Sequence, residues 1–247
     1  MRTKTRGKSL NFIVAGLLIT AAVIFSSCSV KNEISLSADG SGKASLESGI
    51  ANALVFYLQS LAELTGEESA DGKLFNVEEI KKGIEENPGV QVESIKNFND
   101  RRITAKVSFE NIEELILETT ENLGRPIITF EEIGAEKQIK IYIDIDNFTD
   151  IAPLFPVVEE PLFMTFGPLE NQGLTEDEYL EMMEYALGDG GGDLIMQSMI
   201  TTGITVEGSL ISQKGGKVSG ENTVVFETPL IRLLLLDKPI EYSIRFR

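Results

Sequence analysis

The sequence predicts an α+β fold in which an antiparallel sheet carries helices on one face. Residues 76–146 follow the order α-β-β-α-β-β, with short turns inside each strand pair, which is typical of antiparallel hairpins separated by covering helices. The composition, 42% hydrophobic and 25% charged, is ordinary for a globular protein. The 220 residues after the signal are enough for one large domain or two small ones. We expect residues 1–27 to be a signal peptide and residues 28–247 a single α+β domain.

The first twenty-eight residues have the layout of a bacterial lipoprotein signal peptide. Four basic residues, Arg2, Lys4, Arg6 and Lys8, precede an apolar run over residues 10–25. Phe25-Ser26-Ser27-Cys28 then forms a lipobox, with Phe25 where an aliphatic residue is usual. Cleavage before Cys28 would let its thiol take a diacylglycerol, and two or more acyl chains such as palmitate anchor a protein stably. The alternative is an uncleaved membrane helix, but the run is short of the ~20 residues needed.

Residue types that are rare or absent narrow the function further. Cys28 is the only cysteine, so no intramolecular disulfide can form. The absence of histidine removes Ser-His-Asp and Cys-His catalysis and imidazole metal sites. Without residues 1–27 the chain has 18 Lys and Arg against 39 Asp and Glu, a net charge of −21. This charge opposes binding to nucleic acid and to anionic lipid head groups.

The first elements are a hairpin and an apolar helix. Alternation on either side of the turn Asp39-Gly40-Ser41-Gly42 predicts a hairpin over residues 31–47. Residues 49–64 carry no charge before Glu63, which predicts a helix buried against the sheet or, alternatively, lining a ligand cavity. An acidic loop over residues 65–73 follows.

The next elements give the α-β-β-α-β-β order. A helix is predicted from Asn76, a capping residue, to the stop at residues 87–89. One strand begins at residue 90 and a second spans residues 103–109. A helix capped by Asn111 then reaches about residue 123. A second hairpin then covers residues 127–132 and 138–146.

Residues 147–200 change character and form a helical insertion rich in Met and Pro. Thr175 and Glu178 predict a capping box at the start of one helix, and Gly188 its end. The glycines of residues 188–192 suggest a hinge before a short apolar helix over residues 194–200. Because methionine adapts to irregular apolar shapes, the insertion could be a lid on an apolar cavity. The alternative is a helical layer that completes the core.

The C-terminal part returns to strands. Alternation predicts a strand over residues 203–211, a turn at Gly215-Gly216 and a paired strand over residues 218–226. Residues 229–236 form an apolar link with a helical turn. Residues 240–246 alternate once more and give the last strand.

Candidate residues for chemistry are few. Asp144, Asp146 and Asp150 have spacing that suggests calcium, but the glycine and distal glutamate of an EF-hand loop are missing. A strand running into a helix cap explains them better, so we assign no metal, no cofactor and no catalytic residue. The acidic loop and the glycine run show no motif of an acid–base pair or a phosphate loop.

The first turn contains Asp39-Gly40-Ser41-Gly42, and the C-terminal hairpin contains Gly208, Gly215-Gly216 and Val224-Val225-Phe226. These features resemble those of the LppM-type bacterial lipoproteins. Phe226 stands where that family often has Trp, and Glu207 where Pro is common before the glycine. The match covers the two ends of the chain after the signal. The resemblance implies a partly barrel-like α+β envelope domain that binds lipid or glycolipid, without catalytic residues.

These observations give a ranked set of functions. The first hypothesis is a membrane-anchored, non-enzymatic envelope lipoprotein that binds an apolar ligand, a lipid or glycolipid. Its ligand-binding residues would be Leu54, Leu58, Phe163, Met164, Phe166 and Met183. The alternative is a structural or assembly lipoprotein acting through contacts with an envelope protein partner. A hydrolase that uses carboxylates is disfavoured by the absence of histidine.

Overall fold

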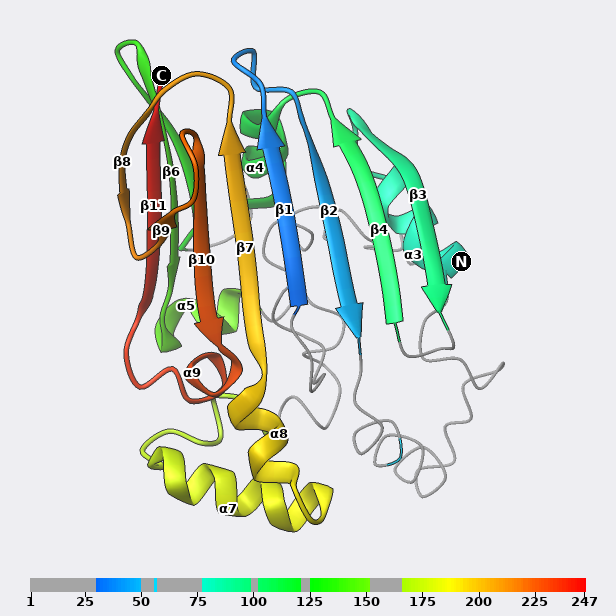
Figure 1. The fold of residues 1–247 in the computed structure, drawn as a ribbon, viewed down its shortest axis with the longest axis vertical. Helices are drawn as coiled ribbons and strands as arrows, with labels where there is room; N and C mark the ends of the chain where they lie inside the picture. The colour runs from blue at the N-terminus through cyan, green and yellow to red at the C-terminus, as the bar shows by residue number, and fades with distance from the viewer. Residues whose placement is uncertain (1–29, 50–55, 57–76, 99–101, 121–124, 152–165) are drawn as a thin grey trace, which may run out of the picture.

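A computed structural model describes residues 30–49, 56, 77–98, 102–120, 125–151 and 166–247. These residues form two β-sheets and six helices (Figure 1). The α+β class predicted from the sequence is therefore confirmed. Within this part of the chain no helix has both the length and the apolar character needed to cross a bilayer.

The larger sheet has seven strands in the order β3-β4-β2-β1-β7-β10-β9. Its strands are β1 (Val30–Leu36), β2 (Gly42–Gly49), β3 (Val90–Phe98), β4 (Arg102–Phe109), β7 (Met199–Val206), β9 (Lys217–Val218) and β10 (Thr223–Pro229). The predicted first hairpin is confirmed as β1 and β2, with Ile34 opposite Ala44. β3 and β4 pair as the two strands predicted between residues 90 and 109.

The smaller sheet has four strands in the order β5-β6-β11-β8. Its strands are β5 (Ile128–Ile133), β6 (Glu136–Ile143), β8 (Leu210–Lys214) and β11 (Ile240–Phe246). The chain passes from β8 in this sheet to β9 in the larger one through Gly215 and Gly216. Neither sheet closes on itself within the described residues.

One strand pair departs from the predicted antiparallel arrangement. β1 and β7 run parallel, with Ile34 opposite Ile204. Parallel neighbouring strands need a long crossover connection, and here residues 37–198 connect β1 to β7. The pairing places β1, the first strand among the described residues, in the middle of the larger sheet.

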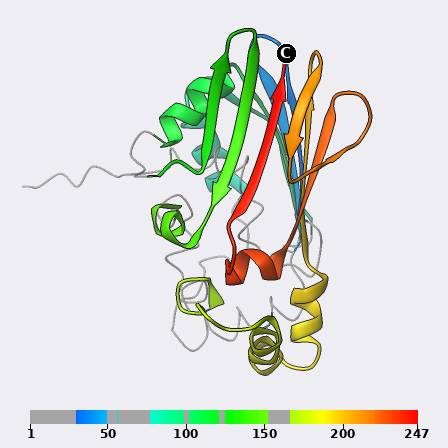
Figure 2. The same cartoon turned by 90° about the vertical axis from the view of Figure 1, so that its left-hand side faces the viewer.

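Five of the six described helices fall into two groups. α3 (Val77–Glu85) and α4 (Ile112–Thr120) lie on the same side of the seven-stranded sheet as the smaller sheet (Figures 1 and 2). α7 (Glu176–Leu187), α8 (Gly191–Gln197) and α9 (Leu230–Leu235) lie toward the end of the molecule where β1 begins. The short α5 (Ile145–Ile151) follows β6. The prediction of helices on one face of the sheet holds for α3 and α4, whereas α7, α8 and α9 lie at one end of the molecule.

The core lies between the seven-stranded sheet and the layer formed by the smaller sheet, α3 and α4. Burial alternates along β1, where Val30 and Ile34 are buried and Lys31 and Glu33 are exposed. The two sheets meet at Phe226 of β10 and Tyr242 of β11, whose ring centroids are 4.8 Å apart. This alternation makes one face of the seven-stranded sheet apolar and leaves its other face polar.

The C-terminal strands differ from the prediction in their bounds and pairing. The expected helix over residues 194–200 ends at Gln197, and β7 begins at Met199. The expected strand over residues 203–211 is interrupted at Gly208, after which β8 pairs with β11 instead of continuing in the larger sheet. Gly208 has φ +103°, and a Cβ there would lie 2.1 Å from the carbonyl oxygen of Arg247. This backbone conformation ends the strand.

Several helix predictions are confirmed in detail. Asn111 Oδ1 accepts hydrogen bonds from the backbone N–H groups of Glu113 (2.9 Å) and Glu114 (3.4 Å) at the start of α4. The capping box of α7 is present, because Thr175 Oγ1 accepts from Glu178 N and Glu178 Oε2 accepts from Thr175 N at 2.8 Å. The apolar link after β10 contains α9. The predicted helix 49–64 lies outside the described residues apart from Phe56 and Gly49, and Gly49 is the last residue of β2 and not part of a helix.

Candidate functional site

Two of the predicted ligand-binding residues lie in the helical end of the core. Met183, on α7, has no exposed surface, and Phe166 is 6% exposed. Tyr179 lies one turn before Met183 on α7, and its hydroxyl donates to the carbonyl oxygen of Phe166 at 2.6 Å. Burial raises the pKa of this tyrosine. The structure thus brings Phe166 and α7 into contact and makes both part of the hydrophobic core.

The other predicted ligand-binding residues, Leu54, Leu58, Phe163 and Met164, lie outside the described residues, as do Cys28 and the acidic loop. The ligand-binding role of the whole set stays a prediction. The same holds for the choice between a lid and a core layer for residues 147–200.

A carboxylate fixes the glycine run between α7 and α8. Glu184 Oε1 accepts from Gly190 N at 2.7 Å, and its Oε2 accepts from Gly192 N at 2.9 Å. These two backbone hydrogen bonds lower the pKa of Glu184 from its ordinary value of 4.5. The segment predicted to be a hinge is therefore held by both oxygens of the carboxylate, and this contact sets α8 against α7.

We expect Glu184→Gln to lower the melting temperature at pH 7. Glutamine keeps the shape but has one acceptor oxygen for two N–H donors. Since the pKa of Glu184 is depressed in the folded protein, its stabilisation is complete above pH 4.5 and is lost as the pH falls through the folded value. The difference in melting temperature between wild type and variant should therefore shrink below pH 4.5, as followed by circular dichroism. Glu181→Gln, on the same helix, is the control for removing one charge; an equal effect there would contradict the prediction.

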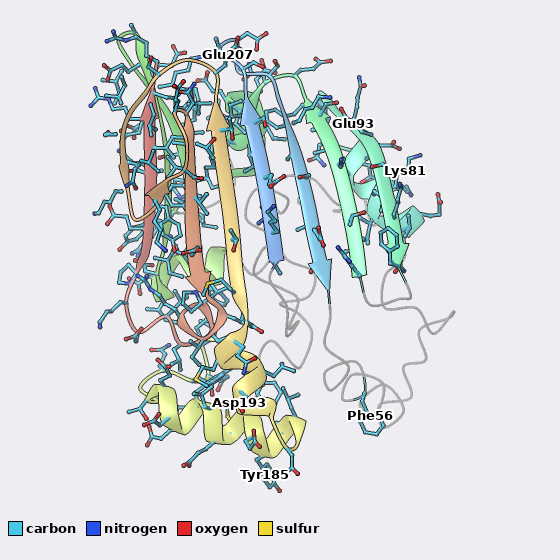
Figure 3. The ribbon with its side chains drawn as sticks, viewed as in Figure 1. Phe56, Lys81, Glu93, Tyr185, Asp193 and Glu207 are labelled. Atoms are coloured by element: carbon cyan, nitrogen blue, oxygen red, sulfur yellow. The ribbon has the colours of Figure 1, made fainter. Side chains whose placement is uncertain are left out.

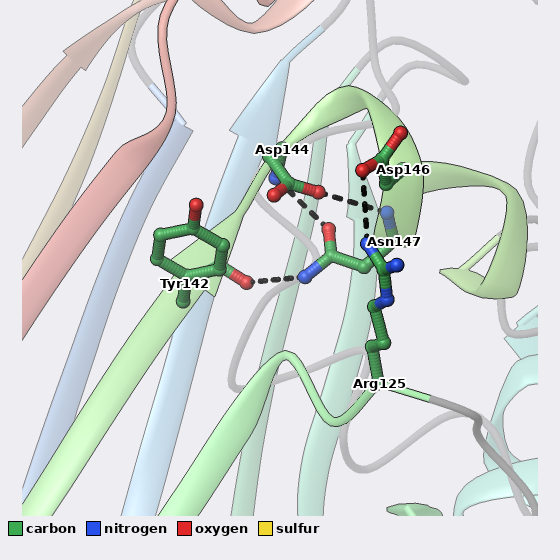
Figure 4. A network of polar contacts seen from close by, with 5 residues as sticks. All are labelled: Arg125, Tyr142, Asp144, Asp146 and Asn147. Atoms are coloured by element: carbon green, nitrogen blue, oxygen red, sulfur yellow. Dashed lines mark hydrogen bonds and ion pairs between the residues drawn. The ribbon is translucent and has the colours of Figure 1, made fainter.

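Of the three aspartates considered for calcium, Asp144 serves a strand-to-helix cap and Asp146 an ion pair (Figure 4). Asp144 Oδ1 accepts from Asn147 N, and Asn147 Oδ1 accepts from Asp144 N, both at 2.9 Å. The Asn147 side chain also donates to the carbonyl oxygen of Tyr142 at 2.9 Å. Asp146 pairs with Arg125 at 2.9 Å. The cap interpretation of Asp144 is what the structure shows, and no group of three His, Cys, Asp or Glu residues in the described segments could hold a metal.

Polar side chains also lie on the interior face of the seven-stranded sheet. Asn32 of β1 is 1% exposed, and Ser48 of β2 has no exposed surface. Asn32 Nδ2 donates to Thr202 Oγ1 of β7 at 3.3 Å. Neither Asn32 Oδ1 nor Ser48 Oγ has a hydrogen-bond partner among the described residues. These two oxygens make this part of the interior chemically different from the apolar core around it.

A second interior polar pair is fully satisfied. The hydroxyls of Thr228 (β10) and Tyr242 (β11) are 2.7 Å apart and share a hydrogen bond between the two sheets. Tyr242 OH also lies 3.4 Å from the carbonyl oxygen of Glu227. The contrast with Asn32 and Ser48 is that here each polar group has a partner.

Neither Asn32 nor Ser48 is among the site residues predicted from the sequence, although the sequence carries a signal for Asn32. The alternation that places Ile34 and Leu36 inward along β1 also places Asn32 inward. A polar residue at an inward strand position is a candidate functional residue, because burying it costs free energy unless it is hydrogen-bonded. Ser48 had no comparable signal, since it falls at the predicted end of the hairpin.

The outward face of the seven-stranded sheet is charged, and no helix or strand among the described residues covers it (Figures 2 and 3). Neighbouring positions present opposite charges, as in the ion pairs Lys31–Glu33 (2.6 Å), Lys43–Glu93 (2.7 Å) and Lys217–Glu227 (2.5 Å). Exposed pairs of this kind contribute little to stability. These pairs place opposite charges side by side on the outward face.

Comparison with known proteins adds a distant likeness. No family model matches the sequence. A search of curated proteins gives no match either. Among solved structures, the chain is similar to the folded domain of the LppM protein of Mycobacterium tuberculosis, with a TM-score of 0.42 and 9% sequence identity over 90% of each chain. At these values the resemblance is a distant structural one.

Proposed function

We propose that this chain is a membrane-anchored envelope lipoprotein, acylated at Cys28, whose α+β domain is non-enzymatic and binds an apolar ligand such as a lipid or glycolipid. One observation carries the anchoring: the signal-like segment ends at Cys28, and the central strand β1 begins at Val30. Two residues span at most about 7 Å. An acylated Cys28 would therefore hold the start of β1 directly at the membrane surface.

The orientation that follows is specific. The helices α7 and α8 lie toward the same end of the molecule as the start of β1, where Figure 3 labels Tyr185 and Asp193, whereas Glu207 lies at the opposite end. We infer that the end bearing α7 and α8 lies nearer the membrane and the end bearing Glu207 points away from it. The net charge of −21 after the signal would repel anionic lipids, so the acyl chains must supply the attachment.

The ligand-binding part of the proposal is supported by the interior of the domain. The core between the two layers is built from apolar side chains of both sheets and of α3, α4, α7 and α9. The unpartnered polar oxygens of Asn32 and Ser48 face the same interior. A non-enzymatic role is supported by the absence of histidine from the sequence and by the use of Asp144, Asp146 and Glu184 in caps and ion pairs.

Anchoring is tested by metabolic labelling. Cells expressing the full chain are fed an alkyne analogue of palmitate, and the purified protein is probed for the label. We expect the wild type to carry the label and to fractionate with membranes, and Cys28→Ala to lose the label. A labelled Cys28→Ala variant, or an unlabelled wild type, would refute acylation at this residue.

Ligand binding is tested by native mass spectrometry of residues 29–247, which keeps every strand and helix described here. We expect a co-purifying adduct with the mass of a lipid. A clean apo mass that takes up no lipid on titration would favour the second candidate, a structural or assembly lipoprotein. That candidate is supported by the uncovered outward face, whose alternating charges suit contact with an envelope protein of complementary pattern.

A further inference from the structure

Two buried oxygens in the interior of the domain have no hydrogen-bond partner among the described residues. They are Oδ1 of Asn32, which is 1% exposed, and Oγ of Ser48, which has no exposed surface. A buried polar group left unpaired costs about 1–3 kcal/mol, and most buried polar groups in folded proteins have a partner. Two such groups close together therefore point to an occupant that supplies the missing hydrogen bonds.

The strand register brings these side chains together. Asn32 lies opposite Leu46 in the β1–β2 pair, so Ser48, two residues further along β2, is its diagonal neighbour on the same face. On the other side, Asn32 lies opposite Thr202 of β7 and donates to it. The three residues thus form a row across three adjacent central strands.

The position of this row along the strands indicates how a bound ligand would be oriented. Asn32, Ser48 and Thr202 lie toward the end of the sheet where β1 begins, the end that Cys28 would hold at the membrane. Further along the same strands, the interior face carries only apolar side chains, including Ile34, Leu36 and Ile204. A ligand with a polar group beside these three residues and an apolar chain beyond them would match both the polar and the apolar part of this interior face.

The hydrogen-bonding groups of this row determine which polar group of a ligand would fit there. Asn32 Oδ1 can only accept a hydrogen bond, whereas the Ser48 hydroxyl can donate and accept. The buried polar residues of the described chain are Asn, Ser and Thr, and none carries a charge. A carboxylate or phosphate would meet an acceptor oxygen and no buried cation, which is costly. A hydroxyl group satisfies both residues.

We propose that Asn32, Ser48 and Thr202 form an internal polar subsite that binds an uncharged hydroxyl group of an amphiphilic ligand, with the acyl chain of the ligand in the apolar interior. This proposal rests on the proposed function, since it names the polar contact of the apolar ligand. The competing occupant is a buried water molecule, which could also supply hydrogen bonds to both oxygens.

The test uses the full acylated protein in phosphatidylcholine nanodiscs and a photoreactive monoacylglycerol. Crosslinking is competed with monoolein, which has free hydroxyls, and with methyl oleate, which has the same chain and none. One hydrogen bond in a buried site is worth about tenfold in affinity. We expect monoolein to compete about tenfold more strongly than methyl oleate in the wild type.

Variants show which residues cause the preference for monoolein over methyl oleate. Asn32→Leu and Ser48→Ala should reduce the monoolein preference to about twofold or less, by weakening monoolein and not methyl oleate. Ser45→Ala, the same change on the outward face of β2, should leave the preference unchanged. Circular dichroism melts show which variants are folded, and Ser48→Ala, which removes one atom, keeps the test decisive if Asn32→Leu unfolds.

The possible failures are distinguishable. If the wild type binds both competitors equally and Ser48→Ala changes nothing, the row holds water only and the subsite is refuted while lipid binding stands. If no probe crosslinks to the interior of the wild type, the proposed function itself fails.

Discussion

Phe226→Ala is expected to destabilise the folded protein by about 3–5 kcal/mol, the range for removing a buried aromatic ring. Phe226 is 1% exposed and packs against the Tyr242 ring at a centroid distance of 4.8 Å. Because these rings join β10 of the larger sheet to β11 of the smaller one, the variant leaves a cavity between the two sheets. The melting temperature should fall by roughly 6–20 °C at 2–4 °C per kcal/mol for a chain of this size.

The neighbouring residue provides the control for this prediction. Val225 lies one position earlier on β10 and points to the outward face, opposite Gly203 of β7. Val225→Ala should cost less than about 1 kcal/mol, since it opens no interior cavity. Chemical denaturation followed by circular dichroism measures both variants. Equal losses for Phe226→Ala and Val225→Ala would mean that the two sheets are not joined through Phe226.

Local sequence patterns predicted most of the elements but not how they assemble. The hairpins β1–β2, β3–β4 and β5–β6 follow from period-two alternation on either side of short turns. Alternation does not say which sheet a hairpin joins. The division into two sheets and the parallel β1–β7 pair depend on contacts between residues about 170 positions apart, for which a single sequence carries no signal.

The candidate site shows the same limit. The Met- and Phe-rich segment around Phe166 and Met183 predicts an adaptable binding surface, but the same composition suits a core, where both residues lie. The inward position of Asn32 follows from the alternation around Ile34. Its lack of a partner could not be predicted, because it depends on what β2, β7 and the opposite layer place around its side chain.

The turn Asp39-Gly40-Ser41-Gly42 requires its two glycines for two different reasons. Gly40 has φ +89°, as the predicted turn requires. Asp39 Oδ1 accepts from both the backbone N–H (2.9 Å) and the hydroxyl (2.7 Å) of Ser41, which lowers the pKa of Asp39. Gly42 is needed for a different reason: a Cβ there would lie 2.3 Å from the carbonyl oxygen of Ser35 and 2.5 Å from the Phe109 ring.

Gly42→Ala is therefore expected to destabilise the protein by about 3 kcal/mol, at the upper end of overpacking costs, and to lower the melting temperature by roughly 6–12 °C. The backbone oxygen of Ser35 cannot move without breaking the pairing of β1 with β2, and Phe109 is buried on β4. The added methyl group thus strains three adjacent strands at once.

Substituting alanine for another glycine of the same sheet, Gly203, should not destabilise the protein. A Cβ added at Gly203 of β7 would have only one atom within 4 Å, the carbonyl oxygen of Asn32 at 3.9 Å, and the φ of Gly203 is not positive. Gly203→Ala should leave stability unchanged or raise it by about 0.5–1 kcal/mol, because alanine loses less backbone entropy on folding. Thermal melts of both variants measure the difference in sign. A loss at Gly203 as large as that at Gly42 would show that any side chain is rejected at these strand positions, whereas the predicted contrast ties the cost to the close approach of Gly42 to Ser35 and Phe109.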